Sequence, residues 1–201
     1  MSYIICGIAG YLLGCVNAAY LVGKSKGFDI RKKGSNNPGA SNAAITMGFK
    51  VGVLVALWDI LKAAIVVFVA KMLFPDDILI GTVAGVGCVL GHMFPVFMGF
   101  KGGKGFASFM GMMLTSNWKA FLIIGIVAVI ITIITDYIAI ATLTTAIVYP
   151  LYIIYSTGDY LIPLVIAVAS LAMVFKHLIN IKRILEGNEI GLSSLWKKKT
   201  S

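Results

Sequence analysis

Seven apolar stretches occupy most of this chain and constrain its fold more than any other feature. They cover residues 3–23, 51–74, 78–98, 104–115, 119–135, 137–156 and 160–176. A helix needs about 20 apolar residues to cross a bilayer, and only the 104–115 stretch is clearly shorter than a full crossing. Because lipid cannot hydrogen-bond exposed backbone groups, we expect these stretches to be helices. The sequence therefore predicts an all-α integral membrane protein with seven transmembrane segments, one of them short.

The composition excludes the other classes of protein. Only 12% of the 201 residues are charged and 59% are hydrophobic, whereas soluble domains carry about 25% charged residues. A soluble domain, a disordered chain and a disulfide scaffold are all ruled out. The three cysteines, Cys6, Cys15 and Cys88, lie in apolar stretches without the spacing of a metal site. We expect them to be packing residues.

The basic residues predict the orientation of the segments in the membrane. Fourteen of the 17 lysines and arginines fall in three regions: residues 24–50, residues 99–104 and the tail from residue 176. Seven crossings place all three regions on one side, and the positive-inside rule makes that side cytoplasmic. We therefore expect the N-terminus outside and the C-terminus in the cytoplasm. The basic tail at 196–201, with Trp196, would lie on the anionic inner leaflet or be merely solvated.

The first polar region, residues 29–42, has the features of an anion site. Asn37 followed by Pro38 is typical of a helix N-cap with proline at the first helical position. The amides of Gly39 and Ala40 would then be free donors at a positive helix end, which favours phosphate. Side-chain donors come from Ser35, Ser41 and Asn42. The alternative is an ordinary polar loop before a well-capped helix.

The second polar region, residues 91–105, combines glycine with lysine. Glycines at 99, 102, 103 and 105 would let the backbone approach a ligand closely. Lys101 and Lys104 supply positive charge, and Lys104 is expected to open the short helix. This pattern favours a phosphate cradle, and attraction to lipid headgroups is the alternative.

Four further ionisable residues are candidates for function or structure. His92 and His177 stand at predicted helix ends on the cytoplasmic side, where either a hydrogen-bonding spacer or a general base is possible. Asp59 and Lys62 lie one helical turn apart within an apolar stretch. Ionisable residues inside a membrane are functional candidates, but this spacing predicts that the two pair with each other.

Together these regions resemble one known family. The most specific block is Gly91-His92-Met93-Phe94-Pro95-Val96-Phe97 with Phe100-Lys101-Gly102-Gly103-Lys104-Gly105. The other blocks are Gly27 to Arg31 with Gly34 to Asn42, Asp59 with Lys62, and His177, Asn180, Ile181, Arg183, Gly187 and Glu189. The chain resembles the bacterial acyl-phosphate:glycerol-3-phosphate acyltransferases of the PlsY type over nearly its whole length.

The resemblance implies a function and a set of site residues. It implies one membrane-embedded domain over residues 1–201, in the bacterial inner membrane, that moves an acyl group from acyl phosphate to the sn-1 hydroxyl of glycerol 3-phosphate. The product would be lysophosphatidic acid, a precursor of phospholipids, and neither a metal, a cofactor nor nucleic acid would take part. The catalytic residues would be Ser35, Asn37, His177 and Asn180. The substrate-binding residues would be Gly39, Ser41, Asn42, Gly102, Gly103, Lys104, Gly105 and Thr142.

Three positions depart from the family pattern. Ile45, Leu178 and Ile179 stand where the family usually has arginine, arginine and glutamate. Losing an arginine removes a bidentate contact with phosphate. A divergent relative that binds a lipid phosphate, or that acylates another acceptor, is therefore the alternative. A transporter is disfavoured, since the chain has no internal repeat and its polar motifs share one predicted face.

Overall fold

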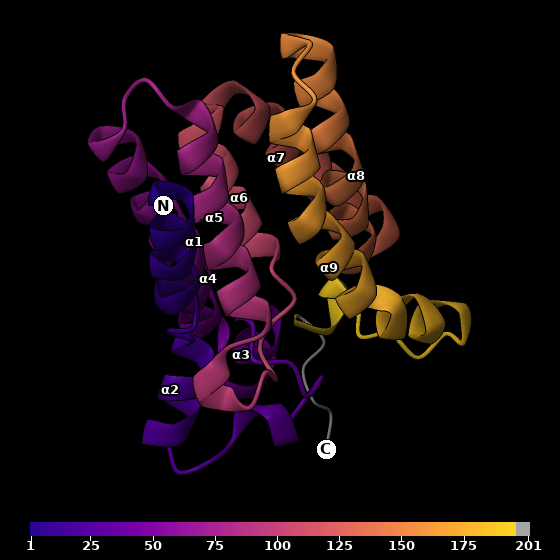
Figure 1. Ribbon diagram of the computed structural model, residues 1–201. Helices are drawn as coiled ribbons and strands as arrows, with labels where there is room; N and C mark the ends of the chain where they lie inside the picture. Colours follow the sequence, from indigo (N-terminus) through magenta and orange to yellow (C-terminus); the bar gives the residue numbers. More distant parts are fainter. Residues whose placement is uncertain (196–201) are drawn as a thin grey trace, which may run out of the picture.

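A computed structural model describes residues 1–195, which form helices and connecting loops without any strand. The helices are α1 (Ser2–Gly14), α2 (Ala18–Ser25), α3 (Ala40–Met47), α4 (Phe49–Leu73), α5 (Ile78–Met93), α6 (Phe106–Ser116), α7 (Trp118–Thr135), α8 (Ile138–Thr157) and α9 (Leu161–Leu185). Short 3-10 turns cover η1 (Ile30–Lys32), η2 (Val96–Met98) and η3 (Leu192–Leu195). The long helices lie side by side, and α2, α3 and the polar loops gather at one end (Figure 1). The expectations for Trp196 and the basic tail fall outside the described residues.

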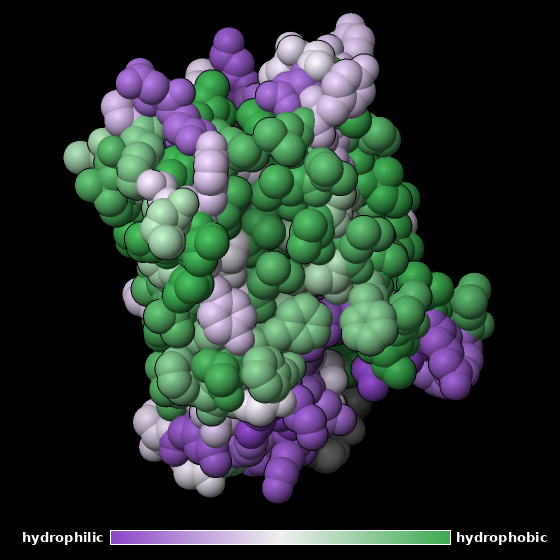
Figure 2. All heavy atoms as spheres, in the orientation of Figure 1, coloured by the Kyte–Doolittle hydropathy of each residue, from purple (hydrophilic) through white to green (hydrophobic). Residues whose placement is uncertain are grey.

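The outer surface is that of a multi-pass membrane protein. Within residues 1–195, six segments are long and apolar enough to cross a bilayer, and α6 is a shorter apolar helix. An apolar belt separates two polar ends of the molecule (Figure 2). Large side chains of the long helices, such as Leu61, Phe68, Ile133 and Leu171, are exposed, as expected where lipid and not water is the solvent.

Two of the predicted segments have different ends from those expected. The first apolar stretch is interrupted after Gly14, and a new helix, α2, begins at Ala18. The side chain of Asn17 explains the break, because its Oδ1 accepts a hydrogen bond from the amide of Tyr20 at 2.8 Å and caps α2. The last segment does not end at residue 176 but continues as α9 to Leu185. Lysine and arginine are good helix formers, so the change to polar sequence does not end the helix.

Glycines on α5 bring it into backbone contact with α1. A Cβ atom at Gly87 would collide with the carbonyl oxygen of Gly7, and one at Gly91 with that of Tyr11. Most of α5 is buried among its neighbours. Cys15 and Cys88 are buried near this interface, and Cys6 is partly buried against a core cluster, so all three pack in the interior as expected.

The predicted pairing of Asp59 with Lys62 is confirmed, and it includes a third residue. Lys62 Nζ lies 2.7 Å from Asp59 Oδ1 and 3.0 Å from Nδ1 of His92. Its ammonium also donates to the carbonyl oxygens of Gly14 and Val16, each at 3.1 Å. The Lys62 side chain has no exposed surface. The cluster therefore joins α4, α5 and the break between α1 and α2.

The close contact of α1 and α5 predicts the effect of a single methyl group. Gly87→Ala should lower the free energy of unfolding by about 1–3 kcal/mol, because the neighbouring backbone cannot move aside cheaply. Gly125→Ala on α7 is the matched control, since its Cβ would meet only the flexible end of Met110. Thermal unfolding in detergent measures both. Equal unfolding temperatures for the two variants would contradict the close packing.

Candidate active site

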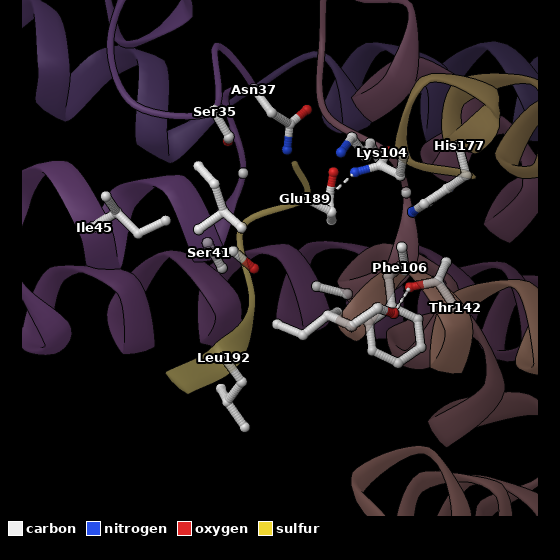
Figure 3. A pocket seen from close by; sticks show the side chains of 18 of the residues that line it. Ser35, Asn37, Ser41, Ile45, Lys104, Phe106, Thr142, His177, Glu189 and Leu192 are labelled. Atoms are coloured by element: carbon white, nitrogen blue, oxygen red, sulfur yellow. Dashed lines mark hydrogen bonds between the residues drawn. The ribbon is translucent and has the colours of Figure 1, made fainter. Parts of the chain in front are cut away.

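One pocket of about 150 Å³ lies where the three polar regions meet. Ser35, Asn37 and Ile45 occupy one side of it, while Lys104, His177 and Thr142 occupy the other (Figure 3). The regions come from opposite ends of the chain, which shows that the fold, and not sequence proximity, assembles the pocket. Nine of the twelve predicted site residues line it: Ser35, Asn37, Gly39, Ser41, Lys104, Gly105, Thr142, His177 and Asn180.

The loop before α3 is held in place by polar side chains. Asn42, which is fully buried, accepts a hydrogen bond from the amide of Ser35 at 2.9 Å and donates to the carbonyl of Lys33 at 2.9 Å. Asn17 donates to the carbonyl of Pro38 at 2.9 Å. Asn42 was predicted to bind substrate, but the structure places it behind the pocket wall as a support for the loop.

An ion pair fixes the start of the same loop. The guanidinium of Arg31 binds the Asp29 carboxylate through two nitrogens and reaches the carbonyl of Met98 at 2.8 Å. The hydrogen bonds from Arg31 lower the pKa of Asp29 to about 2, because they stabilise its charged form. The loop is thus joined to the second polar region through Met98.

The predicted cap at Asn37 is wrong. Helix α3 begins at Ala40, Gly39 stands at the N-cap position, and the amide of Gly39 donates to the carbonyl of Asn37 at 3.0 Å. A tight turn therefore replaces the expected first turn of helix, and the side chain of Asn37 is left facing the pocket. The first-turn amides of Ala40 and Ser41 remain as donors at the positive end of α3.

The glycines of the second region have two different roles. The amides of Gly102 and Gly103 donate to the carbonyls of Met93 and His92, so they are not available to a ligand, contrary to the prediction. These glycines allow the loop to lie against the end of α5, where any Cβ would collide. Gly105 has φ +93°, a conformation that favours glycine, and it stands at the N-cap position of α6.

Lys104 is the lysine that lines the pocket. It lies two residues before α6, so the prediction that it opens this helix is wrong. Partial burial lowers the pKa of Lys104 to about 8, and the nearby Glu189 carboxylate partly opposes this shift. The pKa falls because burial disfavours the charged ammonium, and a bound anion would favour it again.

Helix α9 contributes two polar side chains to the pocket. Nδ1 of His177 lies 2.8 Å from the carbonyl oxygen of Met173. A carbonyl can only accept, so we assign the proton to Nδ1, which leaves Nε2 of the neutral ring as an acceptor. One turn further on, Asn180 donates to Glu189 Oε1 at 2.6 Å. On α8, Thr142 donates to the carbonyl of Ile138 at 2.9 Å.

The segment after α9 turns back and covers part of the pocket. The side chain of Asp136 anchors it through two hydrogen bonds. The amide of Ser193 donates to Oδ1 of Asp136 at 2.7 Å, and the hydroxyl of Ser193 donates to Oδ2 at 2.8 Å. The carbonyl of Asp136 also accepts from the amide of Leu192. Lining residues that were not predicted as site residues are Ala40, Ile45, Asp59, His92, Phe106, Ala107, Ile138, Ala139, Glu189, Ile190, Gly191, Leu192 and Ser194.

The three departures from the family pattern differ in their positions. Ile45 lines the pocket and is 39% exposed. Leu178 and Ile179 are about half exposed on α9 and do not line it. Only the change at residue 45 therefore alters the pocket directly.

Comparison with known proteins settles the family. The model of the family described as glycerol-3-phosphate acyltransferase matches residues 4–187. The chain belongs to this family. Glycerol-3-phosphate acyltransferase 1 of Oceanobacillus iheyensis is 36% identical over the full length of both chains. The corresponding enzyme of Shewanella halifaxensis is 38% identical, with 96% of this chain and 94% of that protein covered.

Solved structures of the family have the same fold. The glycerol 3-phosphate form of PlsY, an integral membrane glycerol 3-phosphate acyltransferase, is 34% identical and matches with a TM-score of 0.90 over 98% of both chains. Its lysophosphatidic acid form is 33% identical, with a TM-score of 0.87 over 97% of both. The family assignment thus rests on sequence and on fold.

The position of Lys104 predicts a difference between the two lysines of the glycine loop. Lys104→Ala should lower kcat/KM for acyl transfer to glycerol 3-phosphate by roughly 10- to 100-fold. This decrease corresponds to the loss of one hydrogen bond to a charged group. Lys101→Ala should change it little, because Lys101 is exposed and does not line the pocket. Wild-type activity should also fall as the pH rises through about 8, where Lys104 loses its proton. Lys104→Arg should move this loss to higher pH. Equal, mild effects of both alanine variants would indicate headgroup attraction instead.

Proposed function

We propose that this protein transfers an acyl group from acyl phosphate to the sn-1 hydroxyl of glycerol 3-phosphate, giving lysophosphatidic acid and phosphate. The observation that carries the proposal is the convergence of Lys104 with the first turn of α3 on one pocket. A lysine and free helix amides are suited to hold a phosphate group. The family and its structure in a glycerol 3-phosphate form support the choice of acceptor.

The reaction needs a group that accepts a proton and groups that stabilise an oxyanion. The acceptor hydroxyl attacks the acyl carbonyl carbon, its proton leaves, and the bond to the phosphate oxygen breaks. His177 offers an acceptor nitrogen to the pocket through Nε2 and is our choice of base. Amides and hydroxyls aimed at the developing negative charge would stabilise the intermediate.

The side chains of the α3 loop are our choice for that stabilising role. Within residues 1–195, Ser35, Asn37 and Ser41 line the pocket with side chains that have no hydrogen-bond partner in the protein. Asn180 has its amide nitrogen bound to Glu189 and a buried carbonyl oxygen without a partner. It would orient a donor on the substrate. Thr142 and Gly105 complete the wall, and no step requires a metal or a cofactor.

Purified protein in lipid vesicles tests the proposal directly. Acyl phosphate and labelled glycerol 3-phosphate should yield labelled lysophosphatidic acid, and His177→Gln should reduce the rate by about 100-fold or more, as expected for a general base. Acyl-coenzyme A in place of acyl phosphate should give no product. Binding of glycerol 3-phosphate without acylation would favour the alternative, a divergent relative that binds a lipid phosphate without this activity.

The isoleucine in the pocket tests whether glycerol 3-phosphate is the acceptor. Ile45 lies in the second half of α3, on the pocket wall. Ile45→Arg should lower KM for glycerol 3-phosphate and change kcat little, because an unreacting phosphate is bound alike in the ground and transition states. The matched control, Ile45→Leu, should leave KM unchanged. If Ile45→Arg raises KM, the pocket has been rebuilt for another acceptor.

We place the protein in the bacterial plasma membrane, with seven segments, the N-terminus outside and the pocket on the cytoplasmic side. The distribution of basic residues supports this orientation. A membrane-impermeant thiol reagent applied to intact cells should label Asp76→Cys and not Lys32→Cys. The wild type, in which Cys6 and Cys88 lie in helices and Cys15 caps the end of α1, gives the background. Labelling of position 32 alone would reverse the orientation.

A further inference from the structure

His92 is a pocket residue that the proposed reaction does not use. It lies at the end of α5, only 3% of its surface is exposed, and it lines the pocket. Its Nε2 atom lies against Gly103, where any Cβ would collide with the ring. Among the described residues, Nδ1 has polar neighbours whereas Nε2 has no hydrogen-bond partner. The ring therefore leaves one nitrogen unused, beside the Gly103–Lys104 loop that borders the pocket.

The neighbours of Nδ1 determine where the proton of the neutral ring resides. Lys62 Nζ lies 3.0 Å from Nδ1 and can only donate. Asp59 Oδ1, which could accept a proton from Nδ1, lies farther away at 3.3 Å and is already 2.7 Å from Lys62. Four acceptors surround the three N–H bonds of Lys62, so one N–H is shared between two of them. A proton on Nδ1 would point at an ammonium only 3.0 Å away, so Nδ1 is the acceptor and Nε2 carries the hydrogen.

From this geometry we infer that His92 is a substrate-binding residue, which donates a hydrogen bond from Nε2 to an oxygen of the substrate. The inference rests on the proposed function, because the pocket must receive an anion or an acyl carbonyl. Lys62 acts as a positioning residue, since it fixes the tautomer through Nδ1 and does not line the pocket itself. The two histidines thus have opposite roles: His177 presents an acceptor to the pocket and His92 presents a donor.

The tautomers can be measured without any catalytic assay. The chain has only two histidines, so the ¹⁵N spectrum of histidine-labelled protein in lipid nanodiscs contains few signals, and His177→Gln assigns them. We expect His92 to carry its proton on Nε2 and His177 on Nδ1. Adding inorganic phosphate or glycerol 3-phosphate should shift the Nε2–H signal of His92. A proton on Nδ1 of His92 would overturn the inference even if the protein proves to be an active acyltransferase.

Two substitutions of His92 distinguish the effect of losing the donor at Nε2 from the effect of losing the contact between Nδ1 and Lys62. His92→Asn places an amide near the position of Nδ1 and removes the group at Nε2, whereas His92→Gln places an amide donor near Nε2. We expect His92→Asn to lower kcat/KM by at least about tenfold, the effect of one hydrogen bond to a charged group, and His92→Gln to retain most of the activity. Thermal unfolding checks that both variants are folded.

The dependence of the rate on the concentration of each substrate identifies the substrate oxygen that His92 binds. A higher KM for glycerol 3-phosphate in His92→Asn places the contact on its phosphate, and a lower kcat with unchanged KM places it on the acyl carbonyl. Equal activity of His92→Asn and wild type, or equal loss in both variants at equal unfolding temperature, would make His92 a structural residue only. A wild type that makes no lysophosphatidic acid would refute the proposed function, while the tautomer measurement would still decide the state of His92.

Discussion

The buried ammonium of Lys62 is the interaction on which the rest of the structure depends. The last carbonyls of any helix lack partners within the helix, and water is not available to bind them inside a membrane protein. Lys62 donates to such a carbonyl at Gly14, the last residue of α1, and to the carbonyl of Val16 in the break that follows. Asp59 balances its charge. Removing one partner of a buried ion pair typically costs about 3–5 kcal/mol, because the other is left unpaired.

The break that Lys62 stabilises determines how the polar loops meet. Because α1 stops at Gly14, Asn17 can begin a new helix and bind the carbonyl of Pro38. That contact positions the loop of Ser35 and Asn37 over the bundle. On the opposite side, the turn at Asp136 holds the chain that follows α9. The pocket is therefore built from loops that are each fixed by polar contacts to a helix end.

Much of this arrangement could be predicted from the sequence. The apolar stretches predicted the long helices, and the spacing of Asp59 and Lys62 predicted their ion pair. The glycine and lysine pattern predicted a phosphate site at Lys104, and this lysine lines the pocket. These predictions succeeded because each depends on local spacing or on the cost of a polar group in lipid.

Other features depend on partners that are distant in the sequence. Asn37 is followed by proline and has the local pattern of a cap, but Asn17 binds Pro38 and moves the helix start to Ala40. The amides of Gly102 and Gly103 are occupied by the end of α5, which no pattern within the loop reveals. Residues 190–194 are ordinary in composition and reach the pocket only because Asp136 binds them.

The burial of α5 has a consequence for biogenesis. The span that contains α5, Ile78–Met98, has a lower mean hydropathy than α4 and α7 and is the most buried of the six long apolar segments described within residues 1–195. Insertion by the translocon depends on the hydrophobicity of each segment, so this span is a weaker signal than α4 or α7. Glycines and His92, which suit a helix surrounded by protein, are the cause. The order of synthesis compensates for this, because α1 and α4 precede α5 and already offer the surfaces against which it packs.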